Sequence, residues 1–196
     1  GRIVYQELTR ITKSIEEGEF FSIKEFNDAI ENCKKYGSKL HIMGLLSDGG
    51  VHSHVRHLYA LIEAAKRKGF EDVYIHCFMD GRDTPPASGE MYITKLKEKM
   101  QEKRWERVKL CYDAMVNGEG KKHTDPIIAI EKSYEQEVFD EFVEPIVMCN
   151  NDGTPVAKIE KNDSVIFFNF RPDRARQITR SLVDKSFDGF DKKDLN

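Results

Sequence analysis

The stretch LHIMGLLSDGGVHSH, residues Leu40–His54, decides the fold of this chain. It begins as an apolar run, Leu40–Leu46, and a glycine pair follows at Gly49. An apolar run of this length before a glycine turn is typical of a buried strand in a parallel sheet. After the turn, apolar residues recur at intervals of three and four over Val51–Lys68, which predicts an amphipathic helix.

The turn itself carries polar side chains that could form a site. Ligands of open α/β sheets bind where strands end and helices begin. Four polar residues of the turn are therefore expected at the functional edge of the sheet: Ser47, Asp48, His52 and His54.

Two further apolar runs repeat this layout. Val73–Met79 is followed by the motif DGRDTPP, and Ser164–Phe170 is followed by RPDRARQ. Three strands then deliver Asp, Arg and His side chains to one edge. Arginine binds carboxylate and phosphate through two parallel hydrogen bonds, and aspartate accepts hydroxyl protons. The pattern predicts a site for a small anion that carries hydroxyl groups.

The arginines argue for function rather than simple turn formation. A turn needs the Asp and Gly of DGRD, but it does not need Arg82 beside Asp83. Arg171 and Arg174 lie one turn apart at the start of a predicted helix. Cations there oppose the helix dipole, which is unfavourable unless an anion lies between them.

Composition excludes several classes of protein. The 196 residues are 39% hydrophobic and 33% charged, which is typical of one soluble globular domain. The net charge of −3 gives no basic field for nucleic acid. No apolar run approaches the ~20 residues of a membrane span, and no signal peptide opens the chain. The four cysteines are scattered without zinc-site spacing, so we expect reduced thiols and a cytoplasmic location.

The remaining segments predict helices and one hairpin. Leu8–Glu17 reads as a helix closed by Gly18, and Ser22 has the spacing of a capping box for the next helix. A further helix starts at Thr124–Pro126, and the Asp-Gly turn within Pro145–Ile159 predicts a β-hairpin. We therefore expect an α/β fold, with a mainly parallel sheet flanked by helices and a small β-hairpin.

One break in the pattern is unexpected. A helix is predicted from Ser88 to Gln101, but its apolar stripe restarts out of phase at Trp105. One helix does not change phase without a kink or bulge. We therefore expect that residues are missing between Glu102 and Lys103, on the order of fifteen to twenty, which would form a strand and its loops.

A metal site is an alternative use of the histidines. His52 and His54 have a common metal-ligand spacing, and His57 and Asp48 lie nearby. The opposing interpretation is that only one histidine faces the site and the others cap a helix or lie on the surface. His41 and His76 lie inside predicted strands, where hydrogen bonding within the sheet is the simpler role.

Several motifs together resemble the cofactor-independent (2,3-bisphosphoglycerate-independent) phosphoglycerate mutase family. The matching pieces are GRIVYQELTRI at the start, GLLSDGGVHSH, DGRDTPP, KRWERV and FFNFRPDRARQ. That family combines two α/β domains, one of them a phosphatase-like domain with a serine nucleophile and two Mn²⁺ or Mg²⁺ ions. The chain resembles the other, an inserted phosphotransferase domain, over essentially all of residues 1–196, which we expect to form a single domain.

The resemblance implies a function and a set of residues. The family interconverts 3-phosphoglycerate and 2-phosphoglycerate in glycolysis through a phosphoserine on the metal domain. The resemblance assigns substrate contacts to these positions: His52, Arg82, Asp83, Arg171, Pro172, Asp173 and Arg174. Asp83 is the expected catalytic acid or base, and no metal ligand is expected in this chain.

Two departures from the family limit these expectations. A strand and a GRYYAMDRD-like loop with two more substrate arginines are missing where Glu102 meets Lys103. The metal domain, which would be the partner within the same polypeptide, is absent, as in an excised domain. We expect a monomeric fragment that binds no nucleic acid or membrane, lacks mutase activity and binds phosphoglycerate weakly. The alternatives are a stand-alone binding module for phosphorylated acids and a metal-dependent phosphohydrolase that uses Asp48, His52 and His54.

Overall fold

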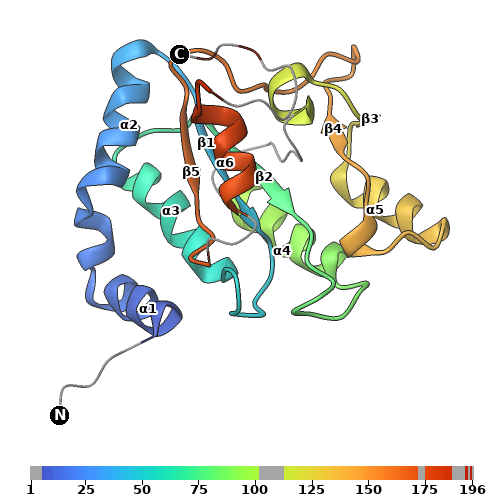
Figure 1. The fold of residues 1–196 in the computed structure, drawn as a ribbon, viewed down its shortest axis with the longest axis horizontal. Coiled ribbons are helices and arrows are strands. Elements are labelled where there is room, and N and C mark those ends of the chain that lie inside the picture. Colours follow the sequence, from blue (N-terminus) through green and yellow to red (C-terminus); the bar gives the residue numbers. More distant parts are fainter. Residues whose placement is uncertain (1–5, 102–112, 172–174, 187–192, 194, 196) are drawn as a thin grey trace.

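The computed structural model describes residues 6–101, 113–171, 175–186, 193 and 195 (Figure 1). A parallel sheet lies at the centre, with β1 (Leu40–Leu45) between β2 (Val73–Phe78) and β5 (Ser164–Phe167). The predicted α/β fold with a mainly parallel sheet is confirmed. The three apolar runs of the sequence are these three strands.

Three helices cover one face of this sheet (Figure 1). They are α1 (Glu7–Glu17), α2 (Lys24–Tyr36) and α3 (Val55–Arg67), with a short 3-10 turn η1 (Glu19–Ser22) between the first two. Their apolar residues share one buried core with alternate residues of the strands, among them Ile30 of α2, Leu58 of α3 and Ile42 of β1. Side chains alternate across a strand, so Met43 and its neighbours serve the opposite face.

The opposite face packs against later segments of the chain. Met43 shares a buried cluster with Met115 and Val116 of the π-type turn η2 (Asp113–Asn117). Ile178 and Leu182 of α6 (Ala175–Val183) pack against the same cluster. Burial on both faces explains why β1 and β2 read as continuous apolar runs. β5 lies at an edge of the sheet and is only partly buried.

The rest of the chain forms a smaller lobe beside the sheet (Figure 1). Its elements are α4 (Gly89–Gln101), β3 (Lys121–His123), α5 (Pro126–Glu135), the 3-10 turn η3 (Asp140–Phe142) and β4 (Ile146–Met148). No helix among the described residues has the length and apolar character needed to cross a membrane.

The predicted hairpin forms, but it is short. β4 pairs in parallel with β3, and its end also meets the residues that follow the turn. The reverse turn does form, since the Gly153 N–H donates to the Asn150 carbonyl at 2.9 Å. The returning arm makes a single bridge between Cys149 and Pro155. Two backbone hydrogen bonds of 2.9 Å flank this bridge, from the Asn150 N–H to the Thr154 carbonyl and from the Val156 N–H to the Met148 carbonyl.

Helix boundaries also differ from the sequence pattern at two points. Ser22 ends η1 and does not cap α2, which begins after Ile23 without a side-chain cap. α3 begins at Val55, four residues later than predicted, and His54 is its N-cap, accepting the Arg56 N–H at 3.1 Å. The phase break and the restart at Trp105 lie outside the described residues.

Buried histidines connect the strands at the end of the sheet where β1 and β5 begin. His41 Nδ1 lies 2.9 Å from His76 Nε2, and His41 Nε2 lies 3.0 Å from the Asp163 carboxylate. The predicted role of His41 and His76 in sheet hydrogen bonding is confirmed. Burial lowers the pKa of His41 below its ordinary value. Burial opposes ionisation of Asp163 as well, but the hydrogen bonds from His41 and from the backbone N–H groups of Lys39 and Glu160 together lower the pKa of Asp163.

The cap of α5 supports a first prediction. The Asp125 carboxylate accepts the backbone N–H groups of Ile127 and Ile128 and lies 2.7 Å from Lys97 Nζ. Asp125→Ala should lower the free energy of unfolding by about 1–2 kcal/mol. Asp125→Asn keeps a capping side chain and should cost less than Asp125→Ala in urea denaturation. Equal losses in the two variants would contradict the capping role.

A second prediction concerns His57, which is 2% exposed and bonds to Thr12 Oγ1 at 3.1 Å. Burial lowers the pKa of His57 to about 4. The unfolded chain therefore takes up this proton first as the pH falls below the ordinary histidine pKa. The contribution of neutral His57 to the free energy of unfolding is fully present above that pKa. Between pH 7.5 and 5.0 this contribution should fall by roughly 2 kcal/mol.

His57→Gln removes this titration, so its urea midpoint should fall less between the two pH values than that of the parent chain. Equal shifts in the two proteins would show that His57 does not govern the acid sensitivity.

Candidate functional site

A cavity of about 300 Å³ opens at the ends of the three strands. Its lining comes from the turns after β1 and β2, from η3, and from the end of β5 with the start of α6. The described lining residues are Leu45, His52, Phe78, Met79, Asp80, Arg82, Asp83, Glu141, Phe167, Asn169, Ala175 and Ile178. The carboxyl ends of parallel strands are the expected place for a ligand in this fold.

Asp80 fixes the turn that follows β2. One oxygen of its carboxylate accepts the backbone N–H groups of Arg82 at 3.1 Å and Asp83 at 2.8 Å. The other oxygen accepts the hydroxyl of Ser47 from the turn after β1. Asp80 is only 5% exposed, so these hydrogen bonds are needed to satisfy its buried carboxylate. The turns after β1 and β2 are thereby joined.

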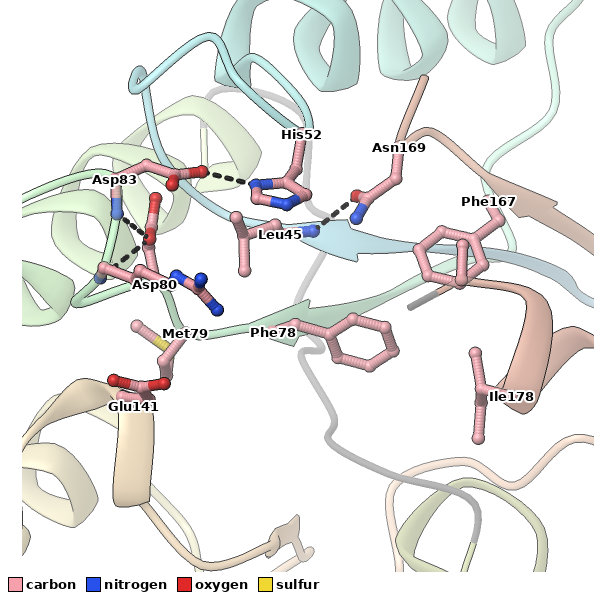
Figure 2. A pocket seen from close by; sticks show the side chains of 12 residues that line it. Leu45, His52, Phe78, Met79, Asp80, Asp83, Glu141, Phe167, Asn169 and Ile178 are labelled. Carbon is pink, nitrogen blue, oxygen red and sulfur yellow. Dashed lines mark hydrogen bonds and ion pairs between the residues drawn. The ribbon is translucent and has the colours of Figure 1, made fainter. Parts of the chain in front are cut away.

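Close packing between the same two turns requires a glycine. A Cβ atom at Gly49 would lie 2.7 Å from the Cβ of Asp83 and 3.2 Å from its carbonyl oxygen. The absence of a side chain at Gly49 lets the two turns approach each other. This approach brings the Asp83 carboxylate to 2.5 Å from His52 Nδ1 (Figure 2).

The end of β5 is attached to the turn after β1. The carbonyl of His52 accepts the backbone N–H groups of Phe170 at 3.0 Å and Arg171 at 3.3 Å. The Asn169 side-chain oxygen accepts the Leu45 N–H at 2.8 Å (Figure 2). All three strand ends are therefore held to the segment that carries His52.

The structure brings together three of the seven predicted site residues. His52, Arg82 and Asp83 line one cavity. Arg171 lies next to His52 through its backbone, while its side chain is exposed and does not line the cavity. The predicted residues Pro172, Asp173 and Arg174 lie outside the described part of the chain.

The histidines after β1 do not converge on a metal. His52 faces Asp83, His54 caps α3, and His57 is buried against Thr12. Among the residues that the structure describes, no group of three or more His, Cys, Asp or Glu side chains could hold an ion. The described residues therefore do not form the metal site that a metal-dependent phosphohydrolase would need.

Asn169 and Glu141 are polar lining residues that the sequence did not assign to the site. Asn169 is the polar residue within the run FFNF, and this interruption of an apolar strand was the available signal. Glu141 lines the cavity from η3, and its surroundings in the sequence give no comparable signal.

The cavity has two chemically different ends. Figure 2 shows Asp80, Asp83 and His52 at one end, and the rings of Phe78 and Phe167 with Ile178 at the other. The rings of Phe78 and Phe167 meet edge to face, with centroids 5.5 Å apart. The described lining holds three carboxylates and one guanidinium, that of Arg82. Its own charge is therefore not sufficient to neutralise a multiply charged anion.

Further hydrogen bonds support the turns from behind. The hydroxyl of Tyr92 on α4 donates to Asp48 at 2.5 Å, and burial followed by this bond raises the pKa of Tyr92 to about 12. The Asp140 carboxylate accepts the N–H groups of Ser88 at 3.1 Å and Gly89 at 2.8 Å and the hydroxyl of Tyr134. These contacts fix α4 and η3 beside the DGRD turn.

Comparison with known proteins places the chain in a family. The profile of the family described as "BPG-independent PGAM N-terminus" matches residues 11–104 and 101–196. The 2,3-bisphosphoglycerate-independent phosphoglycerate mutase of Acetivibrio thermocellus is 55% identical over 212 residues, covering 98% of this chain and 41% of its own length. The enzyme of the same name from Clostridium perfringens is 53% identical over 215 residues, covering 100% of this chain and 42% of its own length.

A solved structure agrees with the sequence relatives. It is described as "Crystal structures of Leishmania mexicana phosphoglycerate mutase at low cobalt concentration" and matches with a TM-score of 0.89 at 27% identity. The match covers 97% of this chain and 40% of that one. The chain thus spans about two fifths of the length of the relatives that it matches. From its sequence profile, its relatives and its fold, the chain belongs to the family of BPG-independent phosphoglycerate mutase N-terminal regions.

Proposed function

We propose that this chain is the substrate-binding part of a 2,3-bisphosphoglycerate-independent phosphoglycerate mutase, which interconverts 3-phosphoglycerate and 2-phosphoglycerate. The observation that carries the proposal is the convergence of His52, Arg82 and Asp83 on one cavity at the ends of parallel strands. The names of the relatives support the reaction, and their greater length implies that the remainder of the enzyme lies on the same polypeptide.

The geometry suggests a role for each residue. The guanidinium of Arg82 binds a carboxylate or phosphoryl oxygen of the substrate, because its fork matches either group. Asp83 accepts a proton from, or returns it to, a glycerate hydroxyl. His52 Nδ1 lies 2.5 Å from the Asp83 carboxylate and orients it, and the imidazolium form of His52 also donates a hydrogen bond to the substrate from Nε2. The family resemblance assigns Arg171 and Arg174 to further charge of the substrate.

The metal of the intact enzyme belongs to the rest of the polypeptide in this proposal. The described residues offer no cluster of ligand groups, so they do not fit a resident Mn²⁺ or Mg²⁺ ion. The cobalt named for the Leishmania structure is a property of that protein. The steps assigned to this chain are therefore binding, orientation and proton transfer at the glycerate.

The proposal includes a cellular setting. The cysteines among the described residues, Cys33, Cys77 and Cys149, are buried free thiols. Free thiols are typical of a reducing compartment, which supports a cytoplasmic location. We propose a monomer whose principal partner is the phosphatase-like metal domain of the same polypeptide.

The isolated chain should not convert 3-phosphoglycerate to 2-phosphoglycerate. It lacks the remaining three fifths of its relatives' length, where the phosphoserine and metal are expected. A coupled mutase assay with added Mn²⁺ should therefore give no turnover above the buffer control. Turnover comparable to that of an intact mutase would contradict the proposal that the phosphoserine and the metal belong to the rest of the polypeptide.

Binding of 3-phosphoglycerate should be weak but should depend on the cavity. Arg82→Gln removes a charge-assisted hydrogen bond, and loss of such a bond should weaken binding by about tenfold or more. Arg56→Gln is a matched control, because Arg56 is exposed on α3 and pairs with Glu16 outside the cavity. NMR titration with 3-phosphoglycerate measures both variants, and equal weakening in the two would contradict the site.

A further inference from the structure

Asn169 lines the cavity just beyond the end of β5, and its side chain carries an uncharged amide. The backbone on either side of it is held by hydrogen bonds. The Phe168 N–H donates to the Met43 carbonyl at 2.9 Å. The Phe170 N–H donates to the His52 carbonyl at 3.0 Å. Asn169 is therefore presented to the cavity from a fixed stretch of backbone, although it lies outside the strand itself.

One hydrogen bond fixes which way the amide of Asn169 is turned. The backbone N–H of Leu45 can only donate, so the Asn169 atom that lies 2.8 Å from it is the side-chain oxygen. The other amide atom is then the nitrogen, Nδ2. Figure 2 shows the amide beside Leu45, with this nitrogen on the side of the other lining residues. Among the residues that the structure describes, none accepts a hydrogen bond from Nδ2.

Close packing against β1 keeps the amide in this orientation. A Cβ atom at Gly44 would lie 2.8 Å from the side-chain oxygen of Asn169 and 2.6 Å from the ring of Phe168. Any larger residue at position 44 would push the amide away from the Leu45 N–H. The absence of a side chain at Gly44 therefore lets the Asn169 oxygen reach its donor, and the amide nitrogen is directed by that contact before any ligand binds.

A directed donor is valuable in this cavity because its lining is rich in acceptors. The three carboxylates of the described lining only accept hydrogen bonds when they are ionised. The side-chain donors of the described lining are Arg82, His52 and Asn169. The carboxylate and phosphoryl oxygens of a phosphoglycerate are also acceptors, and hydrogen bonds to charged acceptors are the stronger ones.

We propose that Asn169 is a substrate-binding residue, whose Nδ2 donates a hydrogen bond to an anionic oxygen of the phosphoglycerate while its side-chain oxygen stays on the Leu45 N–H. The inference rests on the proposed function and adds a contact from the end of β5 to those from the turns after β1 and β2. Because the amide is already oriented, little conformational entropy is lost when the contact forms.

Two substitutions separate this contact from a structural role. Asn169→Asp keeps an oxygen for the Leu45 N–H but loses the donor, and Asn169→Leu loses both groups without adding charge. Each should weaken binding of 3-phosphoglycerate by about tenfold or more in NMR titration. Asn150→Asp is the matched control, because it makes the same charge change at an exposed residue outside the cavity, and it should bind as the parent chain does.

The pattern of the two variants decides between three explanations. Weakening by both Asn169→Asp and Asn169→Leu supports donation from Nδ2. Weakening by Asn169→Leu alone would show that Asn169 only holds the Leu45 backbone. Weakening by Asn169→Asp alone would show only repulsion between the new carboxylate and the anion. Either of the last two results, or parent-like binding by both variants, would overturn the inference.

The side-chain NH₂ signal of Asn169 gives a readout that needs no variant. On titration of the parent chain with 3-phosphoglycerate, this signal should shift along the same saturation curve as the backbone amides of His52 and Arg82. Shifts at His52 and Arg82 without a shift of the Asn169 NH₂ signal would overturn the inference and leave the proposed function standing. The absence of a shift at all three residues would contradict both.

Discussion

The buried carboxylate of Asp80 is the constraint on which the candidate site depends. It receives the backbone of Arg82 and Asp83 on one oxygen and the hydroxyl of Ser47 on the other. A carboxylate that is 5% exposed is stable only when its oxygens are satisfied. The turns after β1 and β2 therefore form as one unit, and the contact between Asp83 and His52 follows from that unit. The DGRD motif thus contains one aspartate that builds the turn and one that faces the cavity.

Much of the fold could be predicted from the sequence because both faces of the sheet are covered. The strands appear as continuous apolar runs, and the helices appear as periodic stripes that end at Gly18 and Gly37. The Asp-Gly turn is a local signal and its hairpin does form, but the pairing of β4 with β3 is not local and could not be predicted. β4 pairs with β3, which lies more than twenty residues earlier. Ser22 likewise has a local capping pattern that η1 overrides.

The candidate site could be predicted in part for a related reason. Strand ends in a parallel sheet share an edge, so the motifs after the strands were expected to meet, and His52, Arg82 and Asp83 do line one cavity. Glu141 could not be found this way, because it reaches the cavity from η3 in the smaller lobe. The different roles of His52 and His54 could also not be predicted from the sequence. The pattern His-x-His does not reveal that His54 caps α3 while His52 faces Asp83.

The line of hydrogen bonds from Asp163 through His41 to His76 has a mechanical consequence. It joins the segment before β5 to β1 and β1 to β2 at the end of the sheet remote from the cavity. The turns around Asp80 and His52 join the same strands at the cavity end. Sliding any strand along its neighbour by one residue would break a buried polar contact at both ends. These contacts hold the three strands in register at both ends. A ligand bound at the edge of the sheet would therefore move with the sheet as one rigid body, because the strands do not slide past one another.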